Sequence, residues 1–141
     1  KMLEGFRGRT GIGEHFDKRL KAFGKREEGA STGVGHGIAY PHVRKKFIVS
    51  EKPMAAFVTA PDGIDWNADD GAKVHLFVVF CGPKTFSNST LKILSDLHEL
   101  TEHLLGRDPD FAKTIARLKS PVDVVDYLMK SFDEIDAEHL L

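Results

Sequence analysis

The chain has 141 residues, and this length favours one domain over residues 1–141, since domains commonly run to roughly 100–200 residues. With 41% hydrophobic and 29% charged residues, it has the composition of a globular protein, which excludes disorder across the whole chain. The 20 Lys and Arg residues nearly balance the 21 Asp and Glu residues, so we expect no nucleic-acid partner. The short basic cluster Arg44-Lys45-Lys46 is interpreted as a solvated loop.

Cysteine content and hydropathy narrow the class of protein further. Cys81 is the one cysteine, which excludes an intramolecular disulfide framework and a multi-cysteine zinc site. The apolar run from Leu76 to Phe80 is far shorter than the roughly 20 residues that a bilayer requires. The first residues lack the apolar core of a signal peptide. We therefore expect a cytoplasmic domain with no direct membrane insertion, and one compatible with being a piece of a longer protein.

Helix and loop patterns occupy the first quarter of the chain. The N-terminal stretch predicts a helix that breaks at residues 11–13. A second helix is predicted from about Glu14 to Lys25, with Phe16, Leu20 and Phe23 on one face. Residues 29–37 are glycine-rich, so they are predicted to form a loop with tight backbone turns.

Three extended segments are predicted next. Residues 38–40 form a short strand that Pro41 stops, and residues 53–59 and 74–81 are strand-like. The last of these is apolar on both faces, which is typical of a central strand covered on both sides. Turn residues occur at 61–63 and 69–71, and residues 64–66 are predicted as a short edge strand.

The last third is predicted to be helical. A long helix ends at Gly106, and its apolar stripe comprises Leu91, Leu94, Leu97, Leu100 and Leu104. Asp108-Pro109 predicts a helix N-cap, and Ser120-Pro121 begins a final helix with Asp123 as capping partner. The buried face predicted for that helix comprises Val122, Val125, Met129 and Phe132. The order of elements predicts an α/β fold, a three-layer domain with a central mixed β-sheet flanked by helices.

Two motif-like stretches do not carry the chemistry that they suggest. The glycines at 33, 35 and 37 lack the G-x-G-x-x-G spacing and precede an extended segment, which argues against nucleotide binding. His98 and His103 are five residues apart, so on a helix they diverge by about 140°. The zinc-protease motif needs a spacing of four, so both histidines are expected to be solvated, and no metal site is predicted.

Pro41-His42 is a stronger candidate, because strand ends and their loops carry the chemistry of α/β folds. Residues 26–42 read Arg-Glu-Glu-Gly-Ala-Ser-Thr-Gly-Val-Gly-His-Gly-Ile-Ala-Tyr-Pro-His. This resembles the signature R-E-x-x-G-S-T-G-I-G-x-G-I-A-I-P-H of the EIIA domain of the bacterial phosphoenolpyruvate-dependent phosphotransferase system, in its mannitol/fructose/nitrogen-regulatory branch. Weaker similarity covers most of residues 14–130. The family usually begins with one more strand and a longer first helix, so the start of this chain looks shortened.

The resemblance implies a phosphohistidine relay without metal or organic cofactor. His42 would accept a phosphoryl group from the phosphocarrier HPr and pass it to a cysteine of an EIIB domain, since a neutral imidazole nitrogen is a good nucleophile near neutral pH. Arg26 would stabilise the phosphoryl group with its planar guanidinium. Ser31 and Thr32 would add neutral hydrogen-bond donors.

Thr90 departs from the family pattern, because it stands where the family commonly has a second histidine. Its hydroxyl can donate to a phosphate, but it cannot carry charge or tune a neighbouring imidazole. His36 and His75 do not obviously substitute. Three hypotheses stay open: a relay in sugar uptake, a nitrogen-regulatory-type module whose phosphorylation state controls a transporter or kinase, and a non-phosphorylated binding module fused to a transporter.

Overall fold

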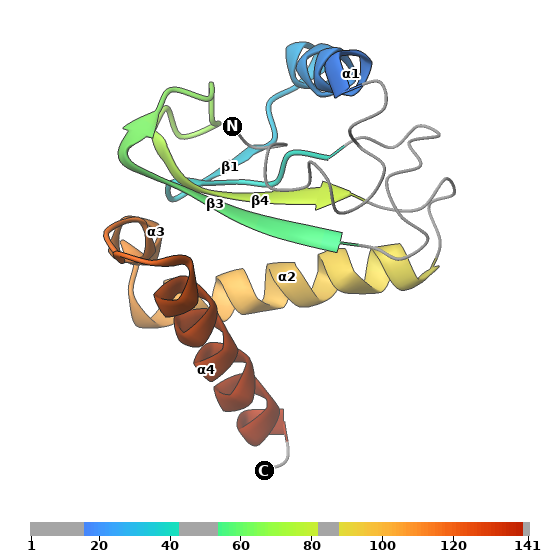
Figure 1. Cartoon of the computed structure of the whole chain (residues 1–141). Helices are drawn as coiled ribbons and strands as arrows, with labels where there is room; N and C mark the ends of the chain where they lie inside the picture. Colours follow the sequence, from blue (N-terminus) through green and yellow to red (C-terminus); the bar gives the residue numbers. More distant parts are fainter. Residues whose placement is uncertain (1–15, 43–53, 82–87, 140–141) are drawn as a thin grey trace.

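The computed structural model describes residues 16–42, 54–81 and 88–139 (Figure 1). The elements in chain order are α1 (Phe16–Gly29), β1 (Gly33–Gly35), β2 (Ile38–Ala39), β3 (Met54–Ile64), β4 (Val74–Cys81), α2 (Asn88–Arg107), α3 (Phe111–Ala116) and α4 (Pro121–His139). The predicted N-terminal helix and the basic cluster at residues 44–46 lie outside the described residues.

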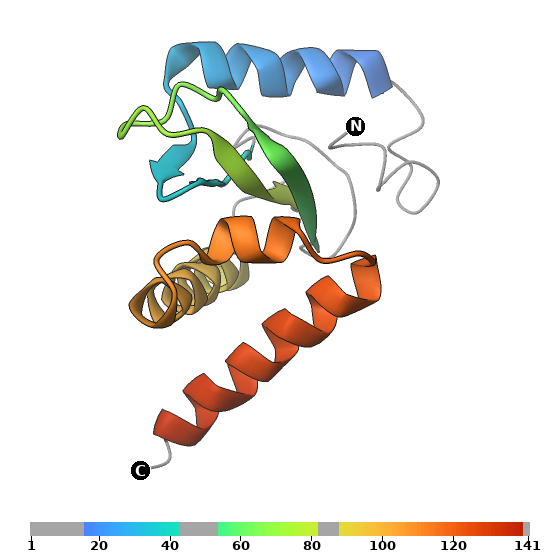
Figure 2. The ribbon, with the colours of Figure 1, turned by 90° about the vertical axis from the view of Figure 1, so that its left-hand side faces the viewer.

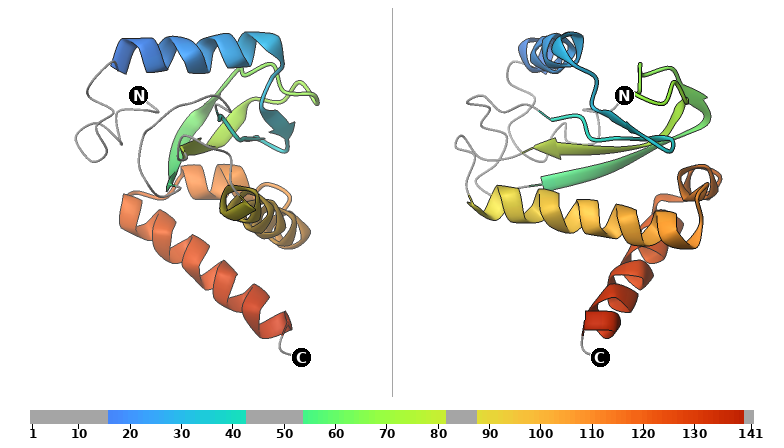
Figure 3. Two further views of the ribbon diagram at one scale, coloured as in Figure 1. Left: turned by 90° about the vertical axis from the view of Figure 1, so that its right-hand side faces the viewer. Right: turned by 180° about the vertical axis from the view of Figure 1, so that it is seen from behind.

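The four strands form one mixed sheet in the order β1-β2-β4-β3. The β1–β2 and β3–β4 pairs are antiparallel, and the β2–β4 pair is parallel. Helix α1 covers one face of the sheet, whereas α2, α3 and α4 lie on the other side (Figures 1, 2 and 3). This arrangement confirms the predicted three-layer α/β fold.

The central strand β4 has both faces buried, as its continuous apolar sequence predicts. Successive side chains of a strand point to opposite faces. Leu76, Val78 and Phe80 therefore pack into the core below the sheet with α2, α3 and α4. Phe77 and Val79 pack on the other face, against Phe23 of α1 and Trp66.

The glycine-rich segment is more regular than a loop, and the loop prediction for residues 29–37 was wrong for its second half. Gly33–Gly35 form β1, which pairs with β2 through the two-residue turn His36-Gly37. Both turn residues have positive φ, 54° at His36 and 77° at Gly37, as a hairpin turn of type I′ requires. Backbone pairing needs no apolar side chains, so the sequence pattern did not show this strand.

Strand β3 continues through the turn predicted at residues 61–63, which was therefore wrong. Gly63 has φ 67°, and the register shifts between Thr59 and Ile64, so the turn residues form an irregularity inside the strand. The edge strand predicted at 64–66 was also wrong: Ile64 ends β3, and Trp66 packs edge-on against Phe77 with ring centroids 4.9 Å apart. The turn predicted near Gly71 is confirmed by its N–H bond to the Ala68 carbonyl.

The helical third has the predicted elements but differs in the faces that it buries. Leu97, Leu100 and Leu104 of α2 are buried, whereas Leu91 is 54% exposed. The N-cap of α3 is Asp110 and not the predicted Asp108, although Asp108 Oδ1 accepts the Asp110 N–H at 2.9 Å just before the helix. Ser120 caps α4 as predicted, because its Oγ accepts the N–H of Asp123.

The buried face predicted for α4 was wrong. Three of its four residues are exposed, and the fourth, Phe132, is partly buried. The buried positions are Val124, Leu128, Ser131 and Ile135. The two stripes are adjacent on the helix, and packing against α2 and the sheet selects one of them. His103, predicted to be solvated, instead lies largely buried beside Glu134 and Glu138 of α4.

Candidate functional site

His42 lies directly after β2, where the chain still runs beside β4. Its backbone pairs in parallel with Phe80, and the Phe80 N–H donates to the Pro41 carbonyl at 3.0 Å. Pro41 has no N–H to donate, but its carbonyl keeps the parallel register. His42 is therefore at the carboxyl end of a parallel strand pair, the edge where α/β sheets place their ligands.

The imidazole of His42 is oriented by the backbone of its own strand. Nδ1 lies 2.8 Å from the carbonyl oxygen of Tyr40. A carbonyl can only accept a hydrogen bond, so Nδ1 carries the hydrogen. In the neutral ring Nε2 then holds the free lone pair, which is the nucleophilic nitrogen. The side chain is partly exposed.

Tyr40 anchors the segment before His42 to α2. Its hydroxyl is hydrogen-bonded to Thr101 Oγ1 and donates to the Leu97 carbonyl at 3.4 Å. Burial raises the pKa of the Tyr40 hydroxyl above 10.0, and the hydrogen bond to Thr101 partly opposes that rise. The fold therefore stabilises the neutral phenol of Tyr40 relative to the phenolate.

Ser31 and Thr32 tie the glycine-rich segment to its surroundings. Thr32 is buried, and its N–H and hydroxyl donate to the Glu27 carboxylate at 2.6 and 2.8 Å, while Trp66 Nε1 donates to the Thr32 hydroxyl. Ser31 Oγ donates to the Trp66 carbonyl at 2.8 Å and accepts the Gly33 N–H. Phosphate binding by these two residues stays a prediction.

Glu27 and Trp66 are the residues that sequence reasoning missed. Glu27 is the second residue of the matched signature, so the motif itself carried a signal for it. Trp66 lies 34 residues from Thr32 in sequence, and no local pattern links the two.

Arg26 is in the last turn of α1, and its Nη1 donates to the Ala30 carbonyl at 2.8 Å. The same helix lines an apolar cleft of about 240 Å³ that ends on Pro41, next to His42. The structure therefore brings α1 to the His42 end of the sheet. Contact between the guanidinium and a phosphoryl group stays a prediction.

Thr90 is in the first turn of α2, and its side chain lies outside the described residues. The start of α2 and the ends of β2 and β4 lie at the same end of the domain (Figures 1 and 3). Thr90, where the resemblance assigns a second histidine, is thus on α2, the element that follows β4 in the chain. Its role stays a prediction.

His36 and His75 lie at the opposite end of the sheet from His42. The carbonyl of Gly37, in the hairpin turn, accepts the N–H groups of His75 and Leu76. His75 is five residue steps along β4 from Phe80, the partner of His42, which corresponds to about 16 Å. Neither histidine therefore lies beside His42.

The described residues contain neither a metal-binding cluster nor a helix able to span a membrane. In residues 16–42, 54–81 and 88–139, no three His, Cys, Asp or Glu side chains are grouped so as to hold a metal ion. Among the helices of these same ranges, none combines the length and apolar character needed to cross a membrane.

The fold is that of a three-layer α/β domain with a histidine at the end of a parallel strand pair. Comparisons with known proteins show to which family of such domains the chain belongs. The family model for the phosphoenolpyruvate-dependent sugar phosphotransferase system, EIIA 2, matches residues 10–131. The chain therefore belongs to this EIIA family, in its mannitol/fructose/nitrogen-regulatory branch.

Curated relatives include sugar-specific and regulatory proteins. The chain is 36% identical over 87 residues to the PTS system fructose-specific EIIA component of Haloferax volcanii, covering 62% of this chain and 55% of that protein. It is 28% identical over 112 residues to the nitrogen regulatory protein homolog of Haemophilus influenzae, covering 79% and 68%. A match to the fructose-specific EIIABC component of Bacillus subtilis, 36% identical, covers 53% of this chain and only 12% of that protein.

Solved structures share the fold. Nitrogen regulatory protein IIA-Ntr from Neisseria meningitidis superposes with a TM-score of 0.59 at 26% identity, covering 77% of this chain and 69% of that one. The complex of enzyme IIAMTL and phosphorylated enzyme IIBMTL from Escherichia coli gives a TM-score of 0.61 at 19% identity, covering 79% and 72%.

Proposed function

We propose that this chain is a phosphohistidine carrier, in which His42 accepts a phosphoryl group from HPr and passes it to an EIIB cysteine during sugar uptake. The observation that carries the proposal is the hydrogen bond from His42 Nδ1 to the Tyr40 carbonyl at the end of the β2–β4 pair. Family membership supports the carrier chemistry, and one structural relative is itself a complex with a phosphorylated enzyme IIB.

The transfer is a pair of substitutions at phosphorus. The Nε2 lone pair forms an N–P bond as the bond from phosphorus to HPr breaks. The ring then carries phosphorus on Nε2 and hydrogen on Nδ1, and the Tyr40 carbonyl stabilises this cationic imidazole. In the second step an EIIB thiolate forms an S–P bond, the N–P bond breaks, and the lone pair returns to Nε2.

Arg26 is proposed to stabilise the charge on the transferred phosphoryl oxygens. A guanidinium has five N–H donors, so the bond to the Ala30 carbonyl leaves donors for a second partner. Ser31 and Thr32 are proposed to act through the loop that they hold, and direct phosphate contact by their hydroxyls would require an exchange of their present partners.

Incubation with phosphoenolpyruvate, enzyme I and HPr tests this function, with an acid-labile phosphate detected by intact mass. We expect one phosphoryl group on the wild-type chain and none on His42→Ala. His98→Ala, which changes an exposed histidine of α2, is the matched control and should be labelled normally. Label on His42→Ala would identify another nucleophile. An unlabelled but folded wild type, beside a working control EIIA, would favour the non-phosphorylated binding module.

A regulatory module of the nitrogen-regulatory type is the second candidate. Two points favour it: Thr90 stands where the resemblance assigns a second histidine, and a nitrogen regulatory homolog matches 79% of this chain. A phosphate on His42 would add a charge of roughly −1.5 to −2 to the surface that a transporter or kinase meets. Transfer from phosphorylated protein to an EIIB cysteine separates the two candidates, and Thr90→His should accelerate it if the missing imidazole limits the relay.

We also propose that residues 1–141 act as one cytoplasmic domain. Limited proteolysis tests the single-domain proposal, since one protease-resistant core that includes both α1 and α4 is expected. Separate resistant fragments would argue against it.

A further inference from the structure

The outer face of α4 exposes a row of large apolar side chains. Val122, Val125 and Met129 are 66%, 52% and 54% exposed, and they follow the i, i+3, i+7 spacing of one helix face. Phe132 continues the row and is partly buried. We call these four residues the α4 stripe. A contiguous apolar row of this kind is informative, whereas single exposed apolar residues are ordinary.

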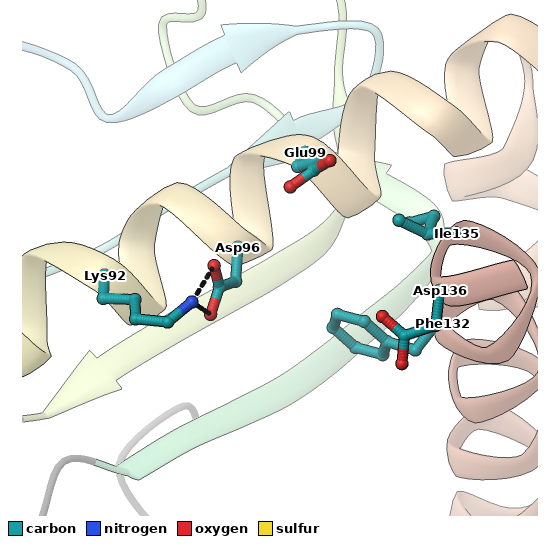
Figure 4. Close-up of a pocket in the computed structure, with 6 residues that line it drawn as sticks. All are labelled: Lys92, Asp96, Glu99, Phe132, Ile135 and Asp136. Atoms are coloured by element: carbon teal, nitrogen blue, oxygen red, sulfur yellow. Dashed lines mark hydrogen bonds and ion pairs between the residues drawn. The ribbon is translucent and has the colours of Figure 1, made fainter. Parts of the chain in front are cut away.

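Clefts adjoin the α4 stripe at both of its ends. Near the start of the helix, Val125 lines a cleft of about 360 Å³ with Ala55 and Phe57 of the edge strand β3. Near its end, Phe132 and Ile135 line a second cleft of about 230 Å³ between α4 and α2 (Figure 4). The stripe thus connects two hollows that side chains of another molecule can fill.

The border of the second cleft is acidic, whereas the charged residue that lines the first cleft is Lys119. The polar residues lining the second cleft are Lys92, Asp96, Glu99 and Asp136, and Lys92 is already paired with Asp96 at 3.0 Å (Figure 4). Helix α4 has six carboxylates and a single lysine, although the whole chain has a net charge of only −1. Asp126, Asp133 and Asp136 are all exposed. Asp133 follows Met129 by four residues and lies beside it on the helix, and Asp136 lies about one turn further along the same face.

We propose that the α4 stripe binds a basic amphipathic helix of a partner protein. Apolar side chains at i, i+3 and i+7 of that helix would pack on the stripe and enter the two clefts. Its lysines and arginines would lie along Asp133 and Asp136, with their aliphatic stems on Phe132. The proposal does not depend on phosphorylation of His42.

Charge decides between this occupant and the alternatives. A second copy of the chain would place the carboxylates of one α4 against those of another, and such like-charge contacts disfavour association. An anionic bilayer would be repelled by the same carboxylates. A helix rich in lysine and arginine is attracted by them and covers the apolar row.

The test is an NMR titration of the ¹⁵N-labelled protein with a synthetic peptide that has leucines at i, i+3, i+7 and i+10 and lysine or arginine on its other face. We expect saturable shifts at Val122, Val125, Met129 and Asp136. Asp133→Lys combined with Asp136→Lys should weaken binding about tenfold or more, since two attractive pairs become repulsive. Asp62→Lys with Asp69→Lys, at exposed sites near the β3–β4 connection, is the matched control and should bind normally.

The apolar contribution has its own variant and its own contrary outcomes. Val125→Ser with Met129→Ser should also weaken binding while the fold is kept, because both side chains are exposed. The proposal fails if a peptide with glutamate in place of each basic residue binds equally well, or if the charge-reversed variant binds like the control. It also fails if dilution of the protein alone, or addition of phosphatidylserine vesicles, produces the stripe shifts and the basic peptide does not.

Discussion

His42 and His75, at opposite ends of the sheet, each bond Nδ1 to a backbone carbonyl, His42 within its own chain segment and His75 across to β3. Nδ1 of His42 lies 2.8 Å from the Tyr40 carbonyl, and Nδ1 of His75 lies 3.0 Å from the Ala60 carbonyl. Both rings therefore present Nε2 as the free nitrogen. At His75, however, a Cβ built on Gly63 would be 2.9 Å from Nε2, so the β3 backbone closes on that atom. A favourable tautomer is not enough for a phosphoacceptor, because the donor must also reach the nitrogen.

The largest expected effect comes from exchanging each histidine for glutamine. His42→Gln should lose phosphorylation by HPr completely, because an amide nitrogen has no lone pair comparable with that of imidazole. His75→Gln should keep it. Phosphorylation followed by intact mass of both variants makes the measurement. Label that depends on His75 and not on His42 would make His75 the phosphoacceptor.

Arg26→Ala is expected to slow phosphorylation about 10²–10³-fold, the range for losing one donor to transition-state charge. Arg26→Lys should recover only part of the rate, because a lysine lacks the two-pronged geometry. Rapid-quench kinetics would measure both, with Lys25→Ala as a neighbouring exposed control. An unchanged rate in Arg26→Ala would mean that the guanidinium serves only the Ala30 carbonyl.

Gly63→Ala tests how tightly the β3 backbone packs against the His75 ring. Gly63 has φ 67°, and an added Cβ would also lie 2.8 Å from Lys73 Cβ, so we expect a loss of about 2–4 kcal/mol in the free energy of unfolding. Gly71→Ala is the matched control: its φ is 68°, and an added Cβ meets nothing within 4 Å, so only about 1 kcal/mol should be lost. Urea unfolding measures both. Equal losses of unfolding free energy in the two variants would mean that the His75 ring moves away from the added Cβ without destabilising the fold.

Tyr40→Phe tests the support under His42 and has the smallest expected effect. Loss of the hydroxyl bonds to α2 should cost about 1 kcal/mol, while phosphorylation persists because the Tyr40 carbonyl is retained. The pKa of Tyr40 is raised in the fold, so its stabilisation is complete below pH 10.0 and is lost as pH rises through the raised pKa. The variant should therefore lose less stability than the wild type above pH 10. An identical alkaline profile would place the titration elsewhere.

The fold was largely predictable where side-chain pattern and burial coincide. The apolar run 74–81 predicted a central strand, and Ser120-Pro121 predicted the start of α4. The apolar side-chain pattern did not predict the strand Gly33–Gly35, because backbone pairing with β2 forms it. Turn residues at 61–63 were misleading, since the chain makes an irregularity there and pairs with β4 again at Ile64.

The candidate site was predictable in identity but not in its connections. The signature at residues 26–42 named Arg26, Ser31, Thr32 and His42. It did not show that Thr32 is hydrogen-bonded to both Glu27 and Trp66, since Trp66 is far away in the sequence. It also left open whether His36 or His75 approaches His42, and the hairpin and β4 place both at the other end of the sheet.

The sequence by itself determined which side chains can do chemistry and where helices and strands form, because motif spacing and apolar periodicity are local properties of the chain. Only the tertiary structure decided which of two adjacent apolar stripes of α4 is buried and which histidine stands at an open end of the sheet. Both depend on what packs against an element from elsewhere in the chain, as Val124 and Val125 show: neighbours on one helix, one buried and the other 52% exposed. Burial is a property of the assembled layers, so it emerges only when the sheet, α2 and α4 meet.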